Sequence, residues 1–305
     1  MSLPVVSIVV TTYNHQDYIK QCLDSILMQK TNFAYEIILG EDESSDGTRE
    51  TCQDYANRFP DIIKLFLRSR KDVIYINDRP TGRYNFIESL KSAKGKYIAL
   101  CEGDDYWTDP DKLQKQVDFL EQHKQYGLCS HNAEEIDFKK PEEKIIIPNT
   151  NLDLKIEDFI RANRLATCSI MFRKDSFKFG LSWFEKIPFG DLCVILNVLK
   201  NTNQKAKVLN DTMAVYRIHS SGIHGSLKSN NTKLIKAYLQ HIKFFKIIKK
   251  ELLFEQIFQK PIYNKLIKTY SILMSLSLKE KKKIMYFKFR FLEVYFKIIK
   301  KIKYV

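Results

Sequence analysis

The first half of the chain alternates between short apolar runs and longer amphipathic segments, and this alternation limits the fold more than any other feature. The apolar runs have the length of strands and the amphipathic segments have the length of helices. A chain with this alternation favours a mainly parallel sheet with helices on its faces. Strands are expected at residues 5–10, 35–40, 62–67 and 97–101, and helices at 16–28, 46–58, 84–93 and 109–123.

The pattern is less regular beyond residue 123. We expect strands at 128–133, 168–172, 207–209 and 212–216, and helices near 154–163 and after Asp191. All 10 glycines precede Lys228, and Pro261 is the only helix breaker that follows it. The sequence therefore predicts an α/β domain over residues 1–227 and an extension of a few long helices over residues 228–305.

The positive charge of the chain is concentrated in this extension. The net charge is +14, but residues 228–305 contain 20 Lys and Arg against 4 Asp and Glu, which leaves 30 against 32 in residues 1–227. The predicted α/β domain is therefore nearly neutral. No recognised nucleic-acid module accompanies the basic charge, so nucleic acid is the least favoured partner.

The last predicted helix has an apolar side and a basic side. Such a helix can lie in the interface of an anionic membrane. It can equally pack on the α/β domain with its lysines facing water, and the sequence leaves both interpretations open. The apolar side carries Ile284, Phe287, Phe291, Tyr295, Ile298 and Ile302, and the basic side carries Lys283, Arg290, Lys297 and Lys301.

The cysteines and the N-terminus predict a cytoplasmic protein. The 6 cysteines are scattered without a Cys-x-x-Cys pair, which favours buried thiols over a zinc site or a disulfide framework. No basic residue precedes the apolar run 5–10, so we interpret it as a strand and not as a signal peptide. No stretch reaches the ~18 apolar residues of a membrane-spanning helix. Any membrane contact is expected to be peripheral, on the inner face.

Carboxylates cluster where two predicted strands end. Glu102, Asp104 and Asp105 follow the strand at 97–101, and Glu-Asp-Glu at 41–43 follows the strand at 35–40. Open α/β sheets bind ligands at the carboxyl ends of their strands. Hard divalent cations prefer carboxylate and phosphate oxygens. A solvated acidic turn ahead of a helix would give the same pattern, so spacing alone leaves both interpretations open.

Three segments, in this order along the chain, resemble the family 2 glycosyltransferases. They are VVSIVVTTYN at 5–14, EDESSDGT at 41–48 and GKYIALCEGDDYW at 95–107, within a resemblance that covers residues 4–222. The resemblance implies a Rossmann-like GT-A fold, a nucleotide-diphosphate-sugar donor, with UDP favoured, and a Mn2+ or Mg2+ ion. It also implies transfer of a hexosyl or hexosaminyl group, with inversion, to a glycan or a lipid-linked acceptor. Surface polysaccharide or glycolipid synthesis is the expected process.

The resemblance assigns roles residue by residue. Thr11 and Asp42 match contacts to the nucleobase, and Asn14 matches the position that ends the first strand. Asp104 matches the metal-binding aspartate, and Glu102 stands where many members have the first aspartate of an Asp-x-Asp motif. The residues expected to bind the donor are Thr11, Tyr13, Asn14, Asp42, Arg83, Glu102, Gly103, Asp104 and Arg217, and the expected metal ligands are Asp104, Glu102 and His219.

Some positions depart from the pattern of the family. Glu102 has a longer arm than aspartate, so it is expected to reach the metal, the ribose or a bound water. Glu41 and Glu43 replace residues that are commoner in the family, which makes the nucleobase pocket less certain than the metal site. Trp107 can line the sugar pocket or pack against the start of a helix.

Inversion requires a base on the face opposite the leaving diphosphate, and Asp191 matches the position of that base in the family. Asp191 also begins a predicted helix, so a helix cap is the structural alternative. Arg217 and His219 belong to Tyr-Arg-Ile-His, which is followed by Ser-Ser-Gly at 220–222 and resembles a closing motif that faces the diphosphate. Arg83, close to Asn85, matches a basic residue near the nucleotide or is a solvated loop cation.

Two other functions are compatible with the sequence. One is a noncatalytic membrane-surface or scaffold protein that keeps the fold, which the glutamate replacements and the basic extension would suit. The other is a metal-dependent nucleotidyltransferase, although the chain has no glycine-rich phosphate loop. A glycosyltransferase is the function that we expect.

Overall fold

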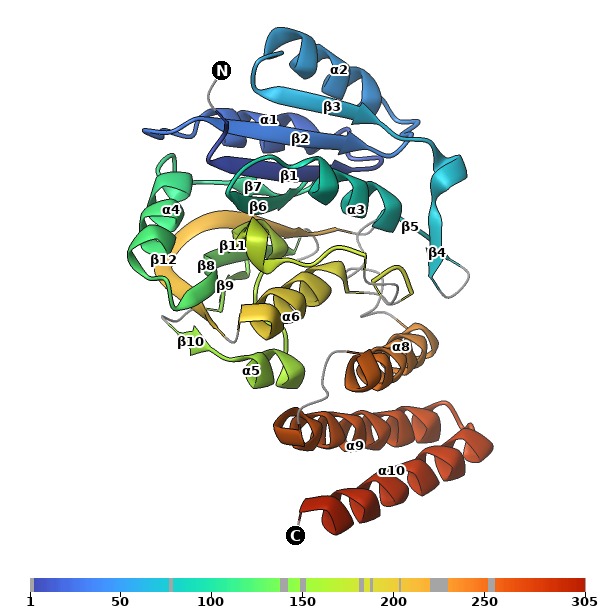
Figure 1. The fold of residues 1–305 in the computed structure, drawn as a ribbon. Coiled ribbons are helices and arrows are strands. Elements are labelled where there is room, and N and C mark those ends of the chain that lie inside the picture. The colour runs from blue at the N-terminus through green and yellow to red at the C-terminus, as the bar shows by residue number, and fades with distance from the viewer. Residues whose placement is uncertain are drawn as a thin grey trace. The chain divides into compact units, whose positions relative to one another are not determined.

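The computed structural model of the protein describes residues 3–76, 79–137, 142–148, 152–180, 184–186, 189–202, 204–219, 230–251 and 256–304. The chain forms two compact units, shown in Figure 1. The predicted boundary between residues 227 and 228 lies outside the described residues. The first unit comprises Met1–Lys155, Arg164–Glu185 and Gly190–Arg217, and the second comprises Ile156–Asn163, Lys186–Phe189 and Ile218–Val305.

The first unit is built on a sheet with the strand order β10-β12-β8-β11-β6-β1-β2-β3 (Figure 1). One half of this sheet is parallel, and its central strands are buried apolar runs. All four of its strands were expected from the sequence, and the predicted α/β class is confirmed. They are β1 (Val6–Thr12), β2 (Tyr35–Glu41), β3 (Ile63–Leu67) and β6 (Tyr97–Glu102).

Helices follow these strands as the periodicity predicts. The buried side of the first helix consists of Ile19, Cys22, Leu23, Ser25 and Ile26, a spacing that places them on one face. The third helix packs on β1 and β2. The helices are α1 (Ile19–Leu27), α2 (Thr48–Arg58), α3 (Arg83–Ser92) and α4 (Lys112–Gln122), and short 3-10 turns form at Arg70–Asp72, Thr167–Ser169 and Lys174–Ser176.

The other half of the sheet is antiparallel, so the sheet as a whole is mixed. Its strands are β7 (Tyr106–Trp107), β8 (Tyr126–Asp137), β9 (Lys144–Ile147), β10 (Asp153–Leu154), β11 (Met171–Arg173) and β12 (Lys205–Ile218). A separate two-stranded sheet consists of β4 (Ile74–Ile76) and β5 (Arg79–Thr81), and α6 spans Gly190–Thr202.

The two strands predicted at 207–209 and 212–216 are one continuous strand, β12. The polar residues between them suggested a turn, but both have partners that suit extended backbone. The Asn210 carbonyl accepts a hydrogen bond from the Asn132 side chain at 2.9 Å, and Asp211 forms an ion pair with Lys115 at 2.9 Å. Strand β9 was missed because its sequence lies in a polar stretch.

The second unit is helical, as predicted for the C-terminal extension. It also includes α5, where the Arg161 carbonyl accepts a hydrogen bond from Lys265 of α9 at 2.6 Å. Pro261 lies inside α9 and does not end it. None of the described helices is long and apolar enough to cross a membrane. The helices are α5 (Ile156–Arg161), α8 (Asn231–Glu251), α9 (Gln256–Lys279) and α10 (Lys283–Tyr304).

One lysine is buried in the core of the first unit. Lys112, the first residue of α4, has no exposed surface, and its Nζ lies 3.5 Å from the centre of the Trp107 ring. Among the described residues this Nζ has no hydrogen-bond partner. Burial disfavours the charged amine and lowers the pKa of Lys112 to about 7.

We expect Lys112→Met to stabilise the protein, most strongly at neutral pH. A lysine in an unfolded chain has a pKa near ~10, so above pH ~7 the unfolded state binds one more proton than the folded state. The stability of the parent therefore rises with pH across this window, and below it the penalty for burying the charge is fully present. Urea unfolding from about pH 7 to about pH 9 should show the gain shrink by about 1.4 kcal/mol per pH unit.

The matched control is Lys115→Met on the same helix, because Lys115 is partly exposed and forms ion pairs with Asp109 and Asp211. This control should show no gain in stability. An equal gain from Lys112→Met at every pH would contradict a lowered pKa of Lys112.

Candidate active site

The two acidic segments meet at the carboxyl end of the parallel strands. Thr11 of β1 lies opposite Glu102 of β6, and Thr12 lies opposite Glu41 of β2. The hydrogen bonds continue past the strand ends, because the Asp42 amide donates to the Thr12 carbonyl at 3.1 Å. The expected convergence of carboxylates on one edge of the sheet is therefore present.

Three carboxylates cluster at the end of β6. Glu102, Asp104 and Asp105 each offer an oxygen, and these oxygens lie within 4.8 Å of one another. Asp105 was absent from the ligands expected from the sequence, and it is only 1% exposed. Its Oδ1 accepts a hydrogen bond from the Arg217 amide at 2.9 Å, while its buried Oδ2 has no partner among the described nitrogen and oxygen donors.

The electrostatics of this cluster suit a divalent cation. Burial, followed by the charges of Asp104 and Asp191, raises the pKa of Glu102 to about 8. Burial also raises the pKa of Asp105, and the neighbouring carboxylates act in the same direction. His15, which carries a positive charge only when it is protonated, has its Nε2 3.8 Å from Asp104 Oδ2. Mg2+ and Mn2+ prefer oxygen ligands, and carboxylates that lie close together offer such ligands along with negative charge.

The loop that carries the carboxylates packs closely against Thr12 and accepts a hydrogen bond from Arg217. A side chain at Gly103 would meet Thr12, since a Cβ there would lie 2.6 Å from Thr12 Oγ1. Arg217 donates to the Asp104 carbonyl at 2.7 Å and also to the side chain of Gln21. Its guanidinium carbon lies 4.3 Å from the centre of the Tyr106 ring. Arg217 is thus engaged by the protein, and its role toward a diphosphate stays a prediction.

A second polar group lies at the end of β2. Asp42 is 2% exposed, and its Oδ2 forms an ion pair with Arg70 at 2.6 Å. The guanidinium carbon of Arg70 lies 4.3 Å from the centre of the Tyr13 ring. Burial raises the pKa of Asp42, and Arg70 opposes this shift. Arg70 was missed in the sequence because it comes from a 3-10 turn after β3, outside the three motifs.

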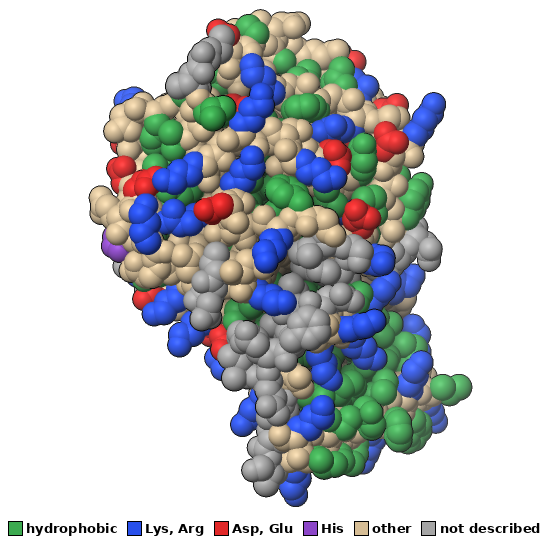
Figure 2. Space-filling view, in the orientation of Figure 1, with side chains coloured by type: hydrophobic (Ala, Val, Ile, Leu, Met, Phe, Trp, Pro, Cys, Tyr) green, Lys and Arg blue, Asp and Glu red, His purple; other side chains and the backbone are tan. Residues whose placement is uncertain are grey.

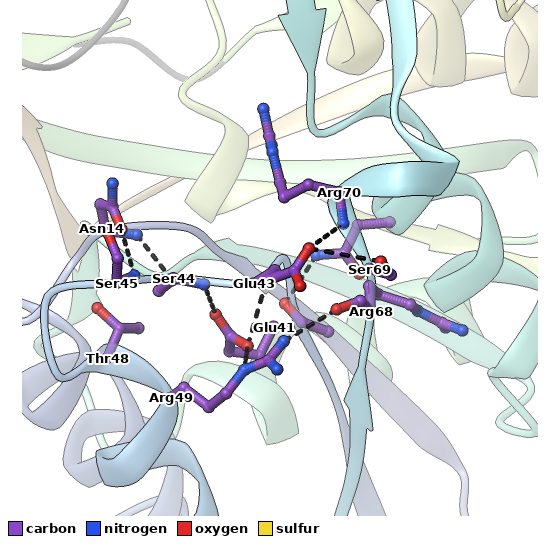
Figure 3. Close-up of polar contacts among 12 residues, drawn as sticks. Asn14, Glu41, Glu43, Ser44, Ser45, Thr48, Arg49, Arg68, Ser69 and Arg70 are labelled. Carbon is purple, nitrogen blue, oxygen red and sulfur yellow. Dashed lines mark hydrogen bonds and ion pairs between the residues drawn. The ribbon is translucent and has the colours of Figure 1, made fainter.

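Glu41 organises the loop that follows β2 (Figure 3). It is fully buried and accepts hydrogen bonds from the Ser44 amide at 2.7 Å, the Glu43 amide at 3.3 Å and the Arg49 side chain. Arg49 in turn donates to the Arg68 carbonyl at 2.9 Å. The glutamate at position 41, which departs from the family pattern, therefore has a structural role in this chain.

Asn14 fastens the other side of the same loop (Figure 3). It has a positive φ of 53°, a conformation that asparagine adopts more readily than most residues. Its Oδ1 accepts a hydrogen bond from the Ser45 amide at 3.0 Å, and its own amide donates to Ser44 Oγ at 2.9 Å. Glu43, also at positive φ, accepts a hydrogen bond from the Arg70 amide. Asn14 and Glu43 thus position Tyr13 and Arg70.

Arg83 and Asp191 lie close enough to Glu102 for their charges to act on it. Arg83 begins α3 and is 7% exposed, so the alternative of a solvated loop cation is wrong. Its guanidinium carbon lies 4.8 Å from the centre of the Phe184 ring, and a Cβ on Gly190 would lie 2.6 Å from its Nη1. Asp191 lies in the first turn of α6, and its charge acts on both Arg83 and Glu102.

Three other residues singled out in the sequence have clear positions. Asn85 is buried and donates to the Gly40 carbonyl at 2.8 Å, so it supports β2. Trp107 is 1% exposed and donates to the Cys168 carbonyl at 2.8 Å, which agrees with packing. His219 follows β12 and belongs to the second unit, so its part in a metal site stays a prediction. The Ser-Ser-Gly segment at 220–222 lies outside the described residues.

Comparison with known sequences identifies the family. The sequence profile described as Glycosyl transferase family 2 matches residues 7–180. The chain belongs to this family. An uncharacterised protein of Mycobacterium tuberculosis is 33% identical over 230 residues, which are 74% of this chain and 62% of that protein. The putative teichuronic acid biosynthesis glycosyltransferase TuaG of Bacillus subtilis is 26% identical over 76% of this chain and 85% of its own.

Solved structures agree with the GT-A fold. S. aureus TarS in complex with UDP-GlcNAc superimposes with a TM-score of 0.54 at 14% identity, covering 90% of this chain and 83% of that one. The mannosyltransferase PcManGT from Pyrobaculum calidifontis, in complex with GDP-Man and Mn2+, gives a TM-score of 0.54 at 16% identity over 99% of this chain and 87% of its own. The predicted GT-A fold is confirmed.

We expect Glu41→Gln to destabilise the protein by about 2 to 4 kcal/mol in urea unfolding, because Arg49 loses its buried anionic partner. The matched control is Glu43→Gln in the same loop, where the side chain is exposed. This control should cost less than about 1 kcal/mol. Equal effects of the two substitutions would show that Glu41 is not the residue that organises the loop.

Proposed function

We propose that this protein is a metal-dependent, inverting glycosyltransferase that takes a hexosyl or hexosaminyl group from a nucleotide-diphosphate sugar. The observation that supports this most strongly is the meeting of the carboxylate cluster and the Asp42 group at one edge of the sheet, in a chain of family 2. The chain spans 62% of the length of its mycobacterial relative. That relative is uncharacterised, so its name adds no activity to this proposal.

In this proposal Glu102, Asp104 and Asp105 hold Mn2+ or Mg2+, and His219 is a further candidate ligand. The unpartnered Oδ2 of Asp105 and the raised pKa of Glu102 fit such an ion. A bound divalent cation would offset the negative charge that develops on the leaving diphosphate. Arg217 holds this cluster by two hydrogen bonds, because its side chain donates to the Asp104 carbonyl and its amide donates to Oδ1 of Asp105.

Asp191 is the proposed base. The acceptor hydroxyl oxygen attacks the anomeric carbon on the face opposite the diphosphate, and its proton passes to an Asp191 carboxylate oxygen as the bond to the diphosphate breaks. This displacement inverts the anomeric centre. Asp191 lies close enough to Arg83 and Glu102 for its charge to act on both.

The nucleobase is proposed to bind between Tyr13, Asp42 and Arg70, beside Thr11 and Asn14. The Asp42 carboxylate can accept a hydrogen bond from an imide N–H, and the Tyr13 ring offers a stacking face. We favour a UDP-sugar donor. The structures of S. aureus TarS with UDP-GlcNAc and of PcManGT with GDP-Man and Mn2+ support a nucleotide-sugar donor in general.

The acceptor is proposed to be a glycan or a lipid-linked glycan in the synthesis of a surface polysaccharide or glycolipid. The name of the relative TuaG, which refers to teichuronic acid biosynthesis, supports this class. We propose that the protein is cytoplasmic and binds the inner face of the membrane peripherally. The reduced state that this location requires agrees with 6 cysteines that are all free and buried.

We expect Asp104→Asn and Asp191→Asn to fail in different ways. Asp104→Asn should abolish the Mn2+-dependent part of UDP binding in calorimetry. Asp191→Asn should keep that binding and lower sugar transfer or donor hydrolysis by about 10²- to 10⁴-fold, the usual contribution of a general base. Before these variants are assayed, hydrolysis of a panel of nucleotide sugars in the presence of Mn2+ identifies the donor.

The products separate the alternatives. Glycosyl transfer releases a nucleoside diphosphate. Nucleotidyl transfer instead moves the nucleoside monophosphate to the acceptor, and it releases pyrophosphate from a nucleoside triphosphate or a sugar 1-phosphate from a nucleotide sugar. A protein that binds no nucleoside diphosphate with or without Mn2+ would be the noncatalytic scaffold. If both aspartate variants retain full transfer, the assignment of this site is wrong.

We expect Asp42→Ala to weaken binding of uridine and of UDP by a similar factor, about tenfold or more, because it removes a charge-assisted acceptor for the base. The loss should be present without metal, which distinguishes it from Asp104→Asn. The exposed carboxylate variant Asp54→Ala, on α2, is the control. An effect of Asp42→Ala on UDP only in the presence of Mn2+ would contradict a nucleobase contact.

A further inference from the structure

The C-terminal helix α10 packs by one side only. Its buried side carries Phe289, which is 3% exposed, and Phe296, which is 8% exposed. Phe296 stacks on Tyr270 of α9 with ring centres 5.6 Å apart, and it also contacts Tyr263 at 6.0 Å. These contacts pack α10 against α9 and determine which side of the helix faces outward.

The opposite side of α10 is apolar and exposed. At 3.6 residues per turn its side chains fall within an arc of about 100°, in a strip about 27 Å long. We call these side chains the apolar strip. Figure 2 shows apolar side chains gathered over the C-terminal helices, with Lys and Arg beside them. The strip consists of Ile284 (87% exposed), Phe287 (65%), Phe291 (70%), Val294 (45%), Tyr295 (48%), Ile298 (53%) and Ile302 (77%).

Basic side chains border the apolar strip on both edges. By helical position Lys288 lies along one edge, and Lys283, Arg290 and Lys301 lie along the other. All four are exposed. Glu293 is the only acidic residue of α10, and it is already bound to Lys297 at 2.8 Å and to Ser271 at 2.7 Å. The face that α10 presents is therefore apolar in the middle and positive at its edges.

This combination selects the partner. An apolar strip left in water is unfavourable unless a partner covers it. A second copy of the chain would bring two rows of lysines together, and a nucleic acid would leave the apolar strip without a role. An anionic lipid surface meets both requirements, because acyl chains take up the phenylalanine and isoleucine side chains while lipid phosphates face the lysines.

We propose that α10 binds an anionic membrane surface through the apolar strip, with the helix axis parallel to the membrane plane and its lysines at the level of the headgroups. The inference rests on the peripheral membrane association proposed above and names the surface that makes it. It is independent of the chemistry at Asp104 and Asp191. A lipid-linked acceptor would then lie in the same membrane as the protein.

Vesicle sedimentation of the full chain tests this proposal. We expect the protein to sediment with vesicles of phosphatidylcholine and phosphatidylglycerol, much less with phosphatidylcholine alone, and less as salt is added. The triple variant Phe287→Ser/Phe291→Ser/Ile298→Ser should lose about 1000-fold in vesicle affinity, since each side chain contributes about tenfold when it enters the acyl region. Lys283→Gln/Lys288→Gln/Lys301→Gln should remove the preference for phosphatidylglycerol.

The control Tyr75→Ser/Ile145→Ser changes exposed apolar residues of the first unit, which are 65% and 52% exposed, and should leave vesicle binding unchanged. Calorimetry with UDP and Mn2+ checks each variant, and the α10 variants should bind as the parent does. If the parent does not bind the nucleotide, the proposed function is wrong, but the proposal that α10 binds a membrane is unaffected. Vesicle binding by the triple serine variant that equals the binding of the parent would overturn this proposal. It would also be overturned if the parent bound no vesicles but formed a dimer, and if the triple serine variant were monomeric.

Discussion

The parallel pairing of β1 with both β2 and β6 is the constraint on which the candidate site depends. It brings Thr11 beside Glu102 and Thr12 beside Glu41, so two acidic segments that are far apart in the sequence end at one edge. A slip of one residue in either pair would move every buried side chain to the other face of the sheet. The apolar core that fixes the register therefore also fixes the distance between Asp42 and the carboxylates of Glu102, Asp104 and Asp105.

The parallel half of the sheet could be predicted because its signals are local. Each strand is a buried apolar run and each helix has one apolar face, so periodicity was sufficient. Strand β12 could not be predicted as one strand, because the partners that keep Asn210 and Asp211 extended come from distant segments. The mixed character of the sheet is likewise a property of long-range pairing.

The meeting of the two acidic segments at one edge of the sheet could be predicted, but the partners of their side chains could not. The motifs led to Glu102, Asp104, Asp42 and Asp191, whereas Arg70 lies in a turn without a motif and meets Asp42 only through the fold. Glu41 stood out in the sequence only as a departure from the family pattern, and in the structure the three hydrogen bonds that it accepts show that it anchors the loop. In each case the missing information is the identity of a partner distant in sequence.

The arginines close to the carboxylates only partly offset the negative charge of the cluster. Arg217 donates to a backbone carbonyl and to Gln21, and Arg83 is shared between Glu102 and Asp191. Burial and mutual repulsion raise the pKa values of Glu102 and Asp105, so the fully ionised cluster is costly unless a cation joins it. A ligand that binds the folded state alone then stabilises the fold by mass action. The electrostatics that make the ionised cluster costly in the free protein are therefore the same ones that would favour the divalent cation proposed to bind there.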